Sequence, residues 1–238
     1  NSPDAEDPGF RVCTFDQVKN AYMQQVRALI AGGCDTLLVE TIFDSLNAKA
    51  ALVAIRDVFD ADRVELPIMI SGSVGRGGEM MISAQTVEAF WNAVEHVNPL
   101  SIGFNCSLGP DLMFPFVAEL AEKANTAVSC YPNAGLPNPL SPTGFDLEPP
   151  DMARFMSQFA DAQLLNIAGG CCGNTPDHIA AIARALEGRH PREFGEAQST
   201  RMISVPSLAQ EAPEAPRPLR LSGSQPFTQQ IGTFMMIG

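Results

Sequence analysis

The feature that most constrains the fold of this chain is a regular alternation of short apolar segments with longer segments of helical periodicity. Five short segments have the apolar character of buried strands, and they cover residues 36–41, 67–73, 100–105, 127–131 and 164–168. Six segments carry apolar residues at helical spacing, and they cover residues 14–31, 48–59, 84–96, 111–123, 150–160 and 176–186. This alternation predicts right-handed βαβ units and a parallel sheet, with strands such as 36–41 buried on both faces.

Polar residues gather at the carboxyl ends of these strands. They are Glu40, Ser71, Asn105, Cys106, Tyr131, Asn133, Cys171 and Cys172. Both a (β/α)8 barrel and a doubly wound sheet bind ligands at such ends, but the chain has no Gly-x-Gly-x-x-Gly turn after a first strand. Since eight units close a barrel, the expected fold is α/β, an incomplete (β/α)8 TIM barrel with about five units that begins after the third strand of a longer protein.

The composition changes after about residue 187. Residues 187–218 are rich in Pro, Ser, Glu and Ala, which is typical of a linker, and residues 219–238 regain apolar character. We therefore predict two parts. Residues 1–187 form the C-terminal part of the barrel, and residues 188–238 form a Pro-rich linker and the start of a following domain.

The charge of the chain excludes some partners. It has 27 acidic and 15 basic residues, a formal net charge of -12, so we expect neither nucleic acid nor a membrane surface as a partner. Six cysteines in 238 residues do not make a disulfide-dense scaffold, and a reducing cytoplasm is the expected location. Chemistry on a small molecule fits this composition best.

Two adjacent cysteines lie between glycines in the segment 169–173, between a predicted strand and a predicted helix. Thr175 suits the N-cap of that helix and Pro176 its first turn. Thiols at such a helix start tend to have a lowered pKa, and the thiolate is the form that binds metals. Neighbouring side chains of a strand point to opposite faces, so the two thiols converge only if glycine allows a sharp turn.

Cys106 ends another predicted strand, and a barrel would bring it to Cys171 and Cys172. Three thiolates with an open fourth position match a catalytic zinc site, and such a zinc favours S-alkylation of a bound thiol over hydrolysis. Two other interpretations of the adjacent cysteines remain, a vicinal disulfide or two small buried residues. Two rival functions also remain: a non-catalytic zinc-binding fragment, and a thiol redox protein, although the expected Cys-x-x-Cys is missing.

Four segments resemble the homocysteine S-methyltransferase family, and they are Glu-Thr-Ile-Phe-Asp at 40–44, Gly-Phe-Asn-Cys at 103–106, Tyr-Pro-Asn-Ala-Gly-Leu-Pro at 131–137 and Gly-Gly-Cys-Cys-Gly at 169–173. The similarity runs from about residue 2 to residue 186. It implies a (β/α)8 barrel with zinc ligands at Cys106, Cys171 and Cys172. It also implies that Glu40 receives the amino group of homocysteine.

Residues 219–223 resemble a connection found in one branch of this family, the cobalamin-dependent methionine synthases. This implies methyl transfer from methylcobalamin to homocysteine, giving methionine, with recharging from 5-methyltetrahydrofolate. The cobalamin-binding and folate-binding domains would lie outside this chain, the latter starting near Phe234. Asn105 and Asn133 are further predicted substrate-binding residues. Asn133 leaves its strand on the same face as the sulfurs, where it could hold the open zinc position or the substrate carboxylate.

Overall fold

In the computed structural model, the structure describes residues 4–7, 9–141 and 144–194, together with the main chain of 219–222 and 226–229. The main sheet consists of β1 (Leu37–Ile42), β2 (Ile68–Gly72), β3 (Ser101–Asn105), β4 (Ala127–Tyr131) and β5 (Ile167–Ala168). The helices are α1 (Phe15–Ala31), α2 (Ser45–Asp62), α3 (Val87–Val94), the 3-10 helix η1 (Glu95–Val97), α4 (Pro110–Lys123), α5 (Pro149–Asp161) and α6 (Pro176–Leu186). The predicted alternation of strands and helices is confirmed.

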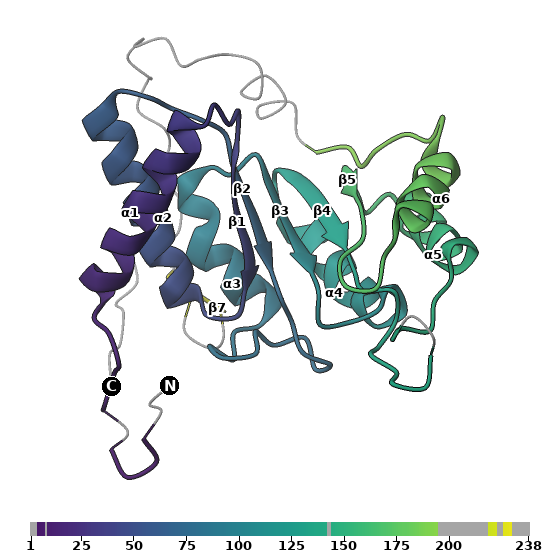
Figure 1. Cartoon of the computed structure of the whole chain (residues 1–238), viewed down its shortest axis with the longest axis horizontal. Coiled ribbons are helices and arrows are strands. Elements are labelled where there is room, and N and C mark those ends of the chain that lie inside the picture. The colour runs from purple at the N-terminus through teal and green to yellow at the C-terminus, as the bar shows by residue number, and fades with distance from the viewer. Residues whose placement is uncertain (1–3, 8, 142–143, 195–218, 223–225, 230–238) are drawn as a thin grey trace.

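All four strand pairings of this sheet are parallel, and the strands follow one another in chain order from β1 to β5 (Figure 1). A doubly wound sheet reverses its strand order at a switch point, and this sheet has no reversal. The expected class, an incomplete TIM barrel with five of eight units, is therefore confirmed.

The two faces of the sheet differ in chemistry. On the face toward the helices, Ile70, Phe104 and Val128 are fully buried in one apolar core with residues of α2, α3 and α4. The opposite face corresponds to the inside of a barrel, and it carries small or polar residues in lateral register, among them Ser71 and Ser129. β3 is thus buried on both faces, as predicted for strands of this sheet, but the face that lines the barrel interior carries small or polar residues instead of apolar ones.

The edge strand β1 departs furthest from the prediction. Leu38 is 43% exposed and Glu40 is also exposed, since no strand pairs with the outer side of β1 among the described residues. The expectation that Glu40 lies on a buried strand was wrong for this reason. The carboxylate is instead accessible from solvent.

The N-terminal cap of α6 fixes the position at which the segment after β5 enters this helix. Thr175 is the N-cap and Pro176 the first helical residue, as predicted. The main-chain N–H of Thr175 donates to Nδ1 of His178 at 3.1 Å, and Nε2 of His178 lies 2.9 Å from the carbonyl of Leu147. His178 therefore carries its proton on Nε2 and acts as a capping residue, although it is buried rather than solvated.

β5 is shorter than the predicted strand 164–168, because at Asn166 a side-chain hydrogen bond takes the place of one main-chain bond between β4 and β5. The main-chain N–H of Asn166 donates to the carbonyl of Val128 at 2.8 Å, and its side-chain oxygen accepts from the N–H of Val128 at 2.9 Å. Its amide group donates to the carbonyl of Arg192 at 2.7 Å. Residues up to Arg192 thus stay bound to the barrel beyond the predicted boundary at 187.

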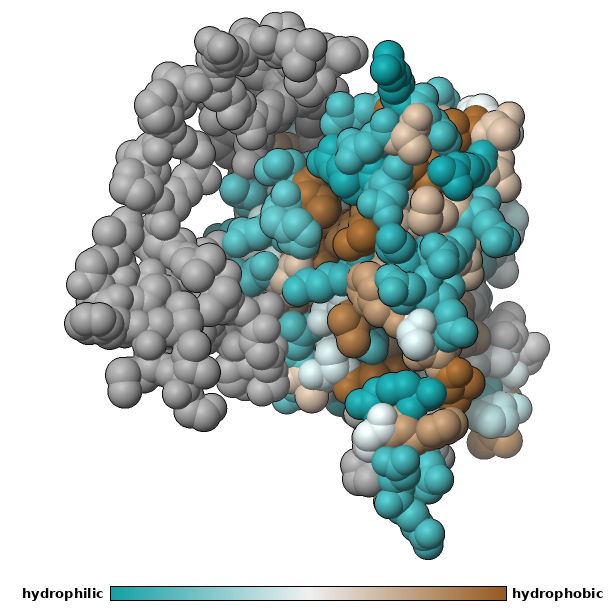
Figure 2. Space-filling view, turned by 90° about the vertical axis from the view of Figure 1, so that its left-hand side faces the viewer, coloured by the Kyte–Doolittle hydropathy of each residue, from teal (hydrophilic) through white to brown (hydrophobic). Residues whose placement is uncertain are grey.

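Most of the predicted linker, and the segment around Phe234, lie outside the described residues. Residues 219–229 contain an antiparallel pair, β6 (Leu219–Ser222) and β7 (Pro226–Gln229), which lies against α3. Figure 2 looks onto the side that carries α1, where hydrophilic residues surround small separate apolar areas. None of the described helices has the length and apolar character needed to cross a membrane.

At Gly103 of β3, the neighbouring strand β4 lies too close to leave room for a side chain. A Cβ at Gly103 would collide with the main-chain oxygen and Oγ of Ser129 on β4. We expect Gly103→Ala to lower the free energy of unfolding by about 2 to 3 kcal/mol, measured by urea denaturation. Gly75→Ala is the matched control, because its Cβ would lie 3.7 Å from the nearest atom, the carbonyl oxygen of Glu79. Equal stability of the two variants would contradict this account.

Candidate metal and thiol site

Three thiols converge at the carboxyl end of the sheet. The Sγ atoms of Cys106 and Cys172 are 3.6 Å apart, those of Cys171 and Cys172 are 3.9 Å apart, and all three lie within 4.8 Å of one another. Zinc–sulfur bonds of about 2.3 Å in a tetrahedron place two sulfurs about 3.8 Å apart. The three cysteines therefore fit a zinc ion with one coordination position left open.

The structure also separates the alternatives for the adjacent cysteines. All six cysteines of the chain are free thiols, and a Cys171–Cys172 separation of 3.9 Å is no disulfide bond. Cys171 is half-buried and Cys172 is exposed, so they are not two small core residues either. The sulfurs face an accessible space, as metal ligands with an open position do.

Cys106 reaches this point through an unusual backbone turn. Cys106 and Ser107 both have positive φ angles, 61° and 60°, and the N–H of Leu108 donates to the carbonyl of Cys106 at 2.6 Å. A left-handed conformation costs about 1 kcal/mol or more per non-glycine residue. Such strain is characteristic of functional sites, and here it occurs at the turn from which Cys106 reaches Cys172.

One segment after β4 connects the turn of Cys106 with that of the adjacent cysteines. The N–H of Cys171 donates to the carbonyl of Pro132 at 2.8 Å, and the N–H of Ala134 donates to the carbonyl of Cys172 at 2.9 Å. The N–H of Asn133 donates to the carbonyl of Leu108 at 3.0 Å. Residues 132–134 are thus the template that fixes the distance between the two cysteine-bearing turns.

Asn133 lies at the predicted end of the barrel and is only 3% exposed. Its side-chain oxygen accepts from the N–H of Cys172 at 3.1 Å, so this oxygen supports the cysteine turn. A direct contact of Asn133 with substrate stays a prediction, with its amide NH₂ group as the available donor.

Glycine makes the turn of the adjacent cysteines possible, as the sequence predicted. Gly173 has φ +79°, and a Cβ there would collide with the ring of Phe145. The side chain of Asn174 then closes the turn, donating to the carbonyls of Pro132 at 3.0 Å and Cys171 at 3.3 Å. The two sulfurs therefore point to the same side.

Asn105 is fully buried between the sheet and the thiols. Its side-chain oxygen accepts from the hydroxyl of Ser71 at 2.7 Å, and its NH₂ group donates to Oγ1 of Thr41 at 2.8 Å. The same NH₂ group lies 3.9 Å from Sγ of Cys171. Asn105 therefore orients a sulfur, and its predicted contact with substrate stays a prediction.

We expect Asn105→Ala to weaken zinc binding about 10- to 100-fold, the usual cost of losing a group that orients a metal ligand. Competition with a chromophoric chelator measures this affinity. Asn47→Ala, on the exposed surface of α2, should leave it unchanged. An affinity of the Asn105→Ala protein within twofold of the unaltered protein would exclude this role.

The electrostatics of the thiols differ from the sequence prediction. Burial is the main cause that raises the pKa of Cys171, and it raises the pKa of Cys172 to about 12. The neighbouring Cys106 raises both further, because clustered thiolates repel one another, whereas hydrogen bonds with Asn105 and Cys172 lower the pKa of Cys171. The expected lowering by the helix start was therefore wrong for the metal-free protein. A bound divalent cation reverses this balance.

Sequence reasoning placed Ser71 and Tyr131 at strand ends without giving them a role, and it missed Thr41. Thr41 has φ 54°, which is rare for a β-branched residue, and its hydroxyl holds Asn105. No sequence pattern indicates this conformation. Only the contact between β1 and β3 across the barrel interior reveals it.

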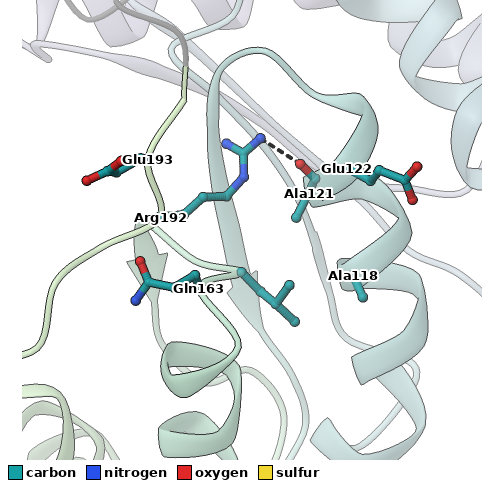
Figure 3. Close-up of a pocket in the computed structure, with 7 residues that line it drawn as sticks. Ala118, Ala121, Glu122, Gln163, Arg192 and Glu193 are labelled. Carbon is teal, nitrogen blue, oxygen red and sulfur yellow. Dashed lines mark hydrogen bonds between the residues drawn. The ribbon is translucent and has the colours of Figure 1, made fainter.

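A surface hollow lies at the other end of the sheet (Figure 3). It is lined by Ala118, Ala121, Glu122, Gln163, Leu164, Arg192 and Glu193. The guanidinium of Arg192 donates to the carbonyls of Ala121 at 2.6 Å, Ala124 at 2.5 Å and Thr126 at 2.9 Å. Arg192 thus caps the carboxyl end of α4, and this hollow is separate from the thiols.

Comparison with known proteins adds the family. A family model described as homocysteine S-methyltransferase matches residues 2–186. Among solved structures, the apo form of the homocysteine methyltransferase MmuM from Escherichia coli is similar with a TM-score of 0.56 and 20% sequence identity. The match covers 74% of this chain and 59% of that one, so the chain spans less than two thirds of that protein's length. At this identity the likeness concerns the fold.

Proposed function

Because the chain belongs to the homocysteine S-methyltransferase family, we propose that it holds zinc and transfers a methyl group to the thiol of homocysteine, giving methionine. One observation supports this most strongly: Cys106, Cys171 and Cys172 have the spacing of three tetrahedral zinc ligands. They lie at the carboxyl ends of the strands, where barrel enzymes have their active sites.

In this reaction the residues of the chain would have separate roles. When bound, zinc supplies activation of the substrate thiol, by favouring its ionised form near neutral pH. Cys106, Cys171 and Cys172 determine where the substrate sulfur lies. The Glu40 carboxylate accepts hydrogen bonds from the substrate ammonium group, so the sulfur is directed toward the methyl donor. The thiol proton is released to solvent, which reaches the exposed Cys172.

For the finer function we propose the cobalamin-dependent methionine synthase branch. The resemblance of residues 219–223 to the connection in that branch supports it. Residues 1–187 would then be part of the homocysteine-binding barrel, and 188–238 would lead to a folate-binding domain. Methylcobalamin would be the methyl donor, recharged from 5-methyltetrahydrofolate, and both cofactors would bind on domains outside this chain. The reaction would take place in the cytoplasm.

Calorimetric titration of the zinc-loaded protein with L-homocysteine and L-homoserine tests the family function. Homoserine has a hydroxyl group in place of the thiol, so we expect binding of homocysteine only. Zinc binding without homocysteine binding would indicate a non-catalytic metal-binding barrel instead.

The branch is tested by comparing methylcobalamin, S-methylmethionine and betaine as donors for methionine formation. We expect methylcobalamin to be the donor that is used. Use of S-methylmethionine or betaine would remove the branch assignment and leave the family function in place.

A further inference from the structure

The phenol hydroxyl of Tyr131 is a buried polar group without a hydrogen-bond partner among the described residues. Tyr131 is the last residue of β4 and lies opposite Asn105 of β3, on the face that lines the barrel interior. A buried donor without a partner is costly, and proteins rarely keep one without a reason. Because this hydroxyl lies near the thiols, a role in the thiol site would explain why the chain keeps a buried donor without a partner.

The groups around this hydroxyl come from three different elements. Ser71 of β2, Glu40 of β1 and Cys171 after β5 lie close enough to influence its pKa. The phenol thus reaches across the barrel interior from β4 toward β1. Burial is the main cause that raises the pKa of Tyr131, so the hydroxyl remains a neutral donor at physiological pH.

Glu40 is the complementary group. Its carboxylate is exposed on the edge strand, and it lies near enough to the phenol of Tyr131 to raise the pKa of that group. A buried hydroxyl that meets no acceptor in strict hydrogen-bonding geometry and a carboxylate that can accept its hydrogen therefore lie close together.

We propose that Tyr131 is a positioning residue that donates its phenol hydrogen to the Glu40 carboxylate when an amino-acid thiol occupies the site. This inference rests on the proposed function, in which Glu40 receives the substrate ammonium group. A carboxylate accepts several hydrogen bonds, so it can hold the phenol and the ammonium group together. A free Glu side chain loses conformational entropy when it is ordered, and the hydrogen bond from Tyr131 offsets this loss.

The test measures binding of three thiols to zinc-loaded Tyr131→Phe protein. L-homocysteine has both end groups, 3-aminopropane-1-thiol lacks the carboxylate, and 4-mercaptobutyrate lacks the amino group. We expect binding of the two amino thiols to weaken about 10- to 100-fold, the usual effect of losing a hydrogen bond to a charged group. Binding of 4-mercaptobutyrate should not change, since it offers nothing for Glu40 to hold.

A second variant tests whether Tyr131 acts through Glu40. In a Glu40→Ala background, adding Tyr131→Phe should weaken homocysteine binding by less than twofold, because each change removes one partner of the same interaction. Tyr22→Phe is the matched control. Tyr22 is the only other tyrosine of the chain, and its hydroxyl donates to Asn47 at 3.2 Å on the surface.

The outcomes separate this inference from the proposed function. Weaker binding of 4-mercaptobutyrate to Tyr131→Phe protein would mean that Tyr131 contacts the substrate carboxylate or supports packing, and would overturn the inference. Independent effects of the two substitutions would overturn it as well. Absence of homocysteine binding in the unaltered protein would overturn the proposed function and the inference together, whereas binding that Tyr131→Phe leaves intact overturns the inference alone.

Discussion

Replacing Cys106, Cys171 or Cys172 with alanine is expected to reduce bound zinc from about one ion per chain to almost none and to abolish methyl transfer. Two remaining thiolates cannot complete the three-ligand set, and the open position that we propose for the substrate sulfur loses its geometry. Elemental analysis of dialysed, reduced protein measures the zinc content. Each cysteine supplies one of the three sulfur ligands, so each single replacement should have the same outcome, although the three residues lie on two different turns.

The control for these variants is Cys13→Ser, because Cys13 is exposed and precedes α1, far along the chain from the three thiols. It should retain zinc and activity. Thermal unfolding of all four metal-free proteins separates loss of a ligand from loss of the fold. Stoichiometric zinc in the Cys171→Ala protein would show that the ligand assignment is wrong.

Zinc affinity should also rise with pH. The pKa values of Cys171 and Cys172 are raised in the metal-free protein, the latter to about 12, so both thiols carry protons at neutral pH. Zinc must displace those protons, and each unit of increasing pH below these pKa values makes displacement easier. Proton release on zinc binding, measured in weakly buffered solution, reports the same linkage.

Replacing Glu40 with glutamine is expected to weaken homocysteine binding about 10- to 100-fold, and to lower the rate of methyl transfer to bound homocysteine as well. The amide keeps the shape of the side chain but removes its charge, so the charged acceptor that we propose for the substrate ammonium group is lost. A less oriented substrate directs its sulfur less often toward the methyl donor. Steady-state kinetics over a range of homocysteine concentrations separates the two effects.

Glu65→Gln serves as the control, because Glu65 is an exposed carboxylate that precedes β2, at the opposite end of the sheet. Its kinetics should match those of the unaltered protein. Unchanged homocysteine kinetics in the Glu40→Gln protein, with zinc intact, would remove Glu40 from the site and leave the three-cysteine assignment standing.

The sequence alone determined the architecture, because the physical signals for it are local. Apolar periodicity predicted the helices and strands, and the positions of Cys106, Cys171 and Cys172 after strand ends predicted that their sulfurs meet. Parallel strands place their carboxyl ends at one edge, so this convergence follows from topology. The cap at Thr175 and the turn at Gly173 were also readable, since each depends on neighbouring residues.

The tertiary structure decided what depends on contacts between distant residues. Asn105 is oriented by Ser71 and Thr41, and Asn133 supports the N–H of Cys172, across gaps in sequence that no local pattern encodes. The raised thiol pKa values depend on burial and on neighbouring sulfurs. Exposure of Glu40 likewise depends on its edge strand. Each of these features arises from the spatial neighbours of a group, and a single sequence does not state which neighbours those are.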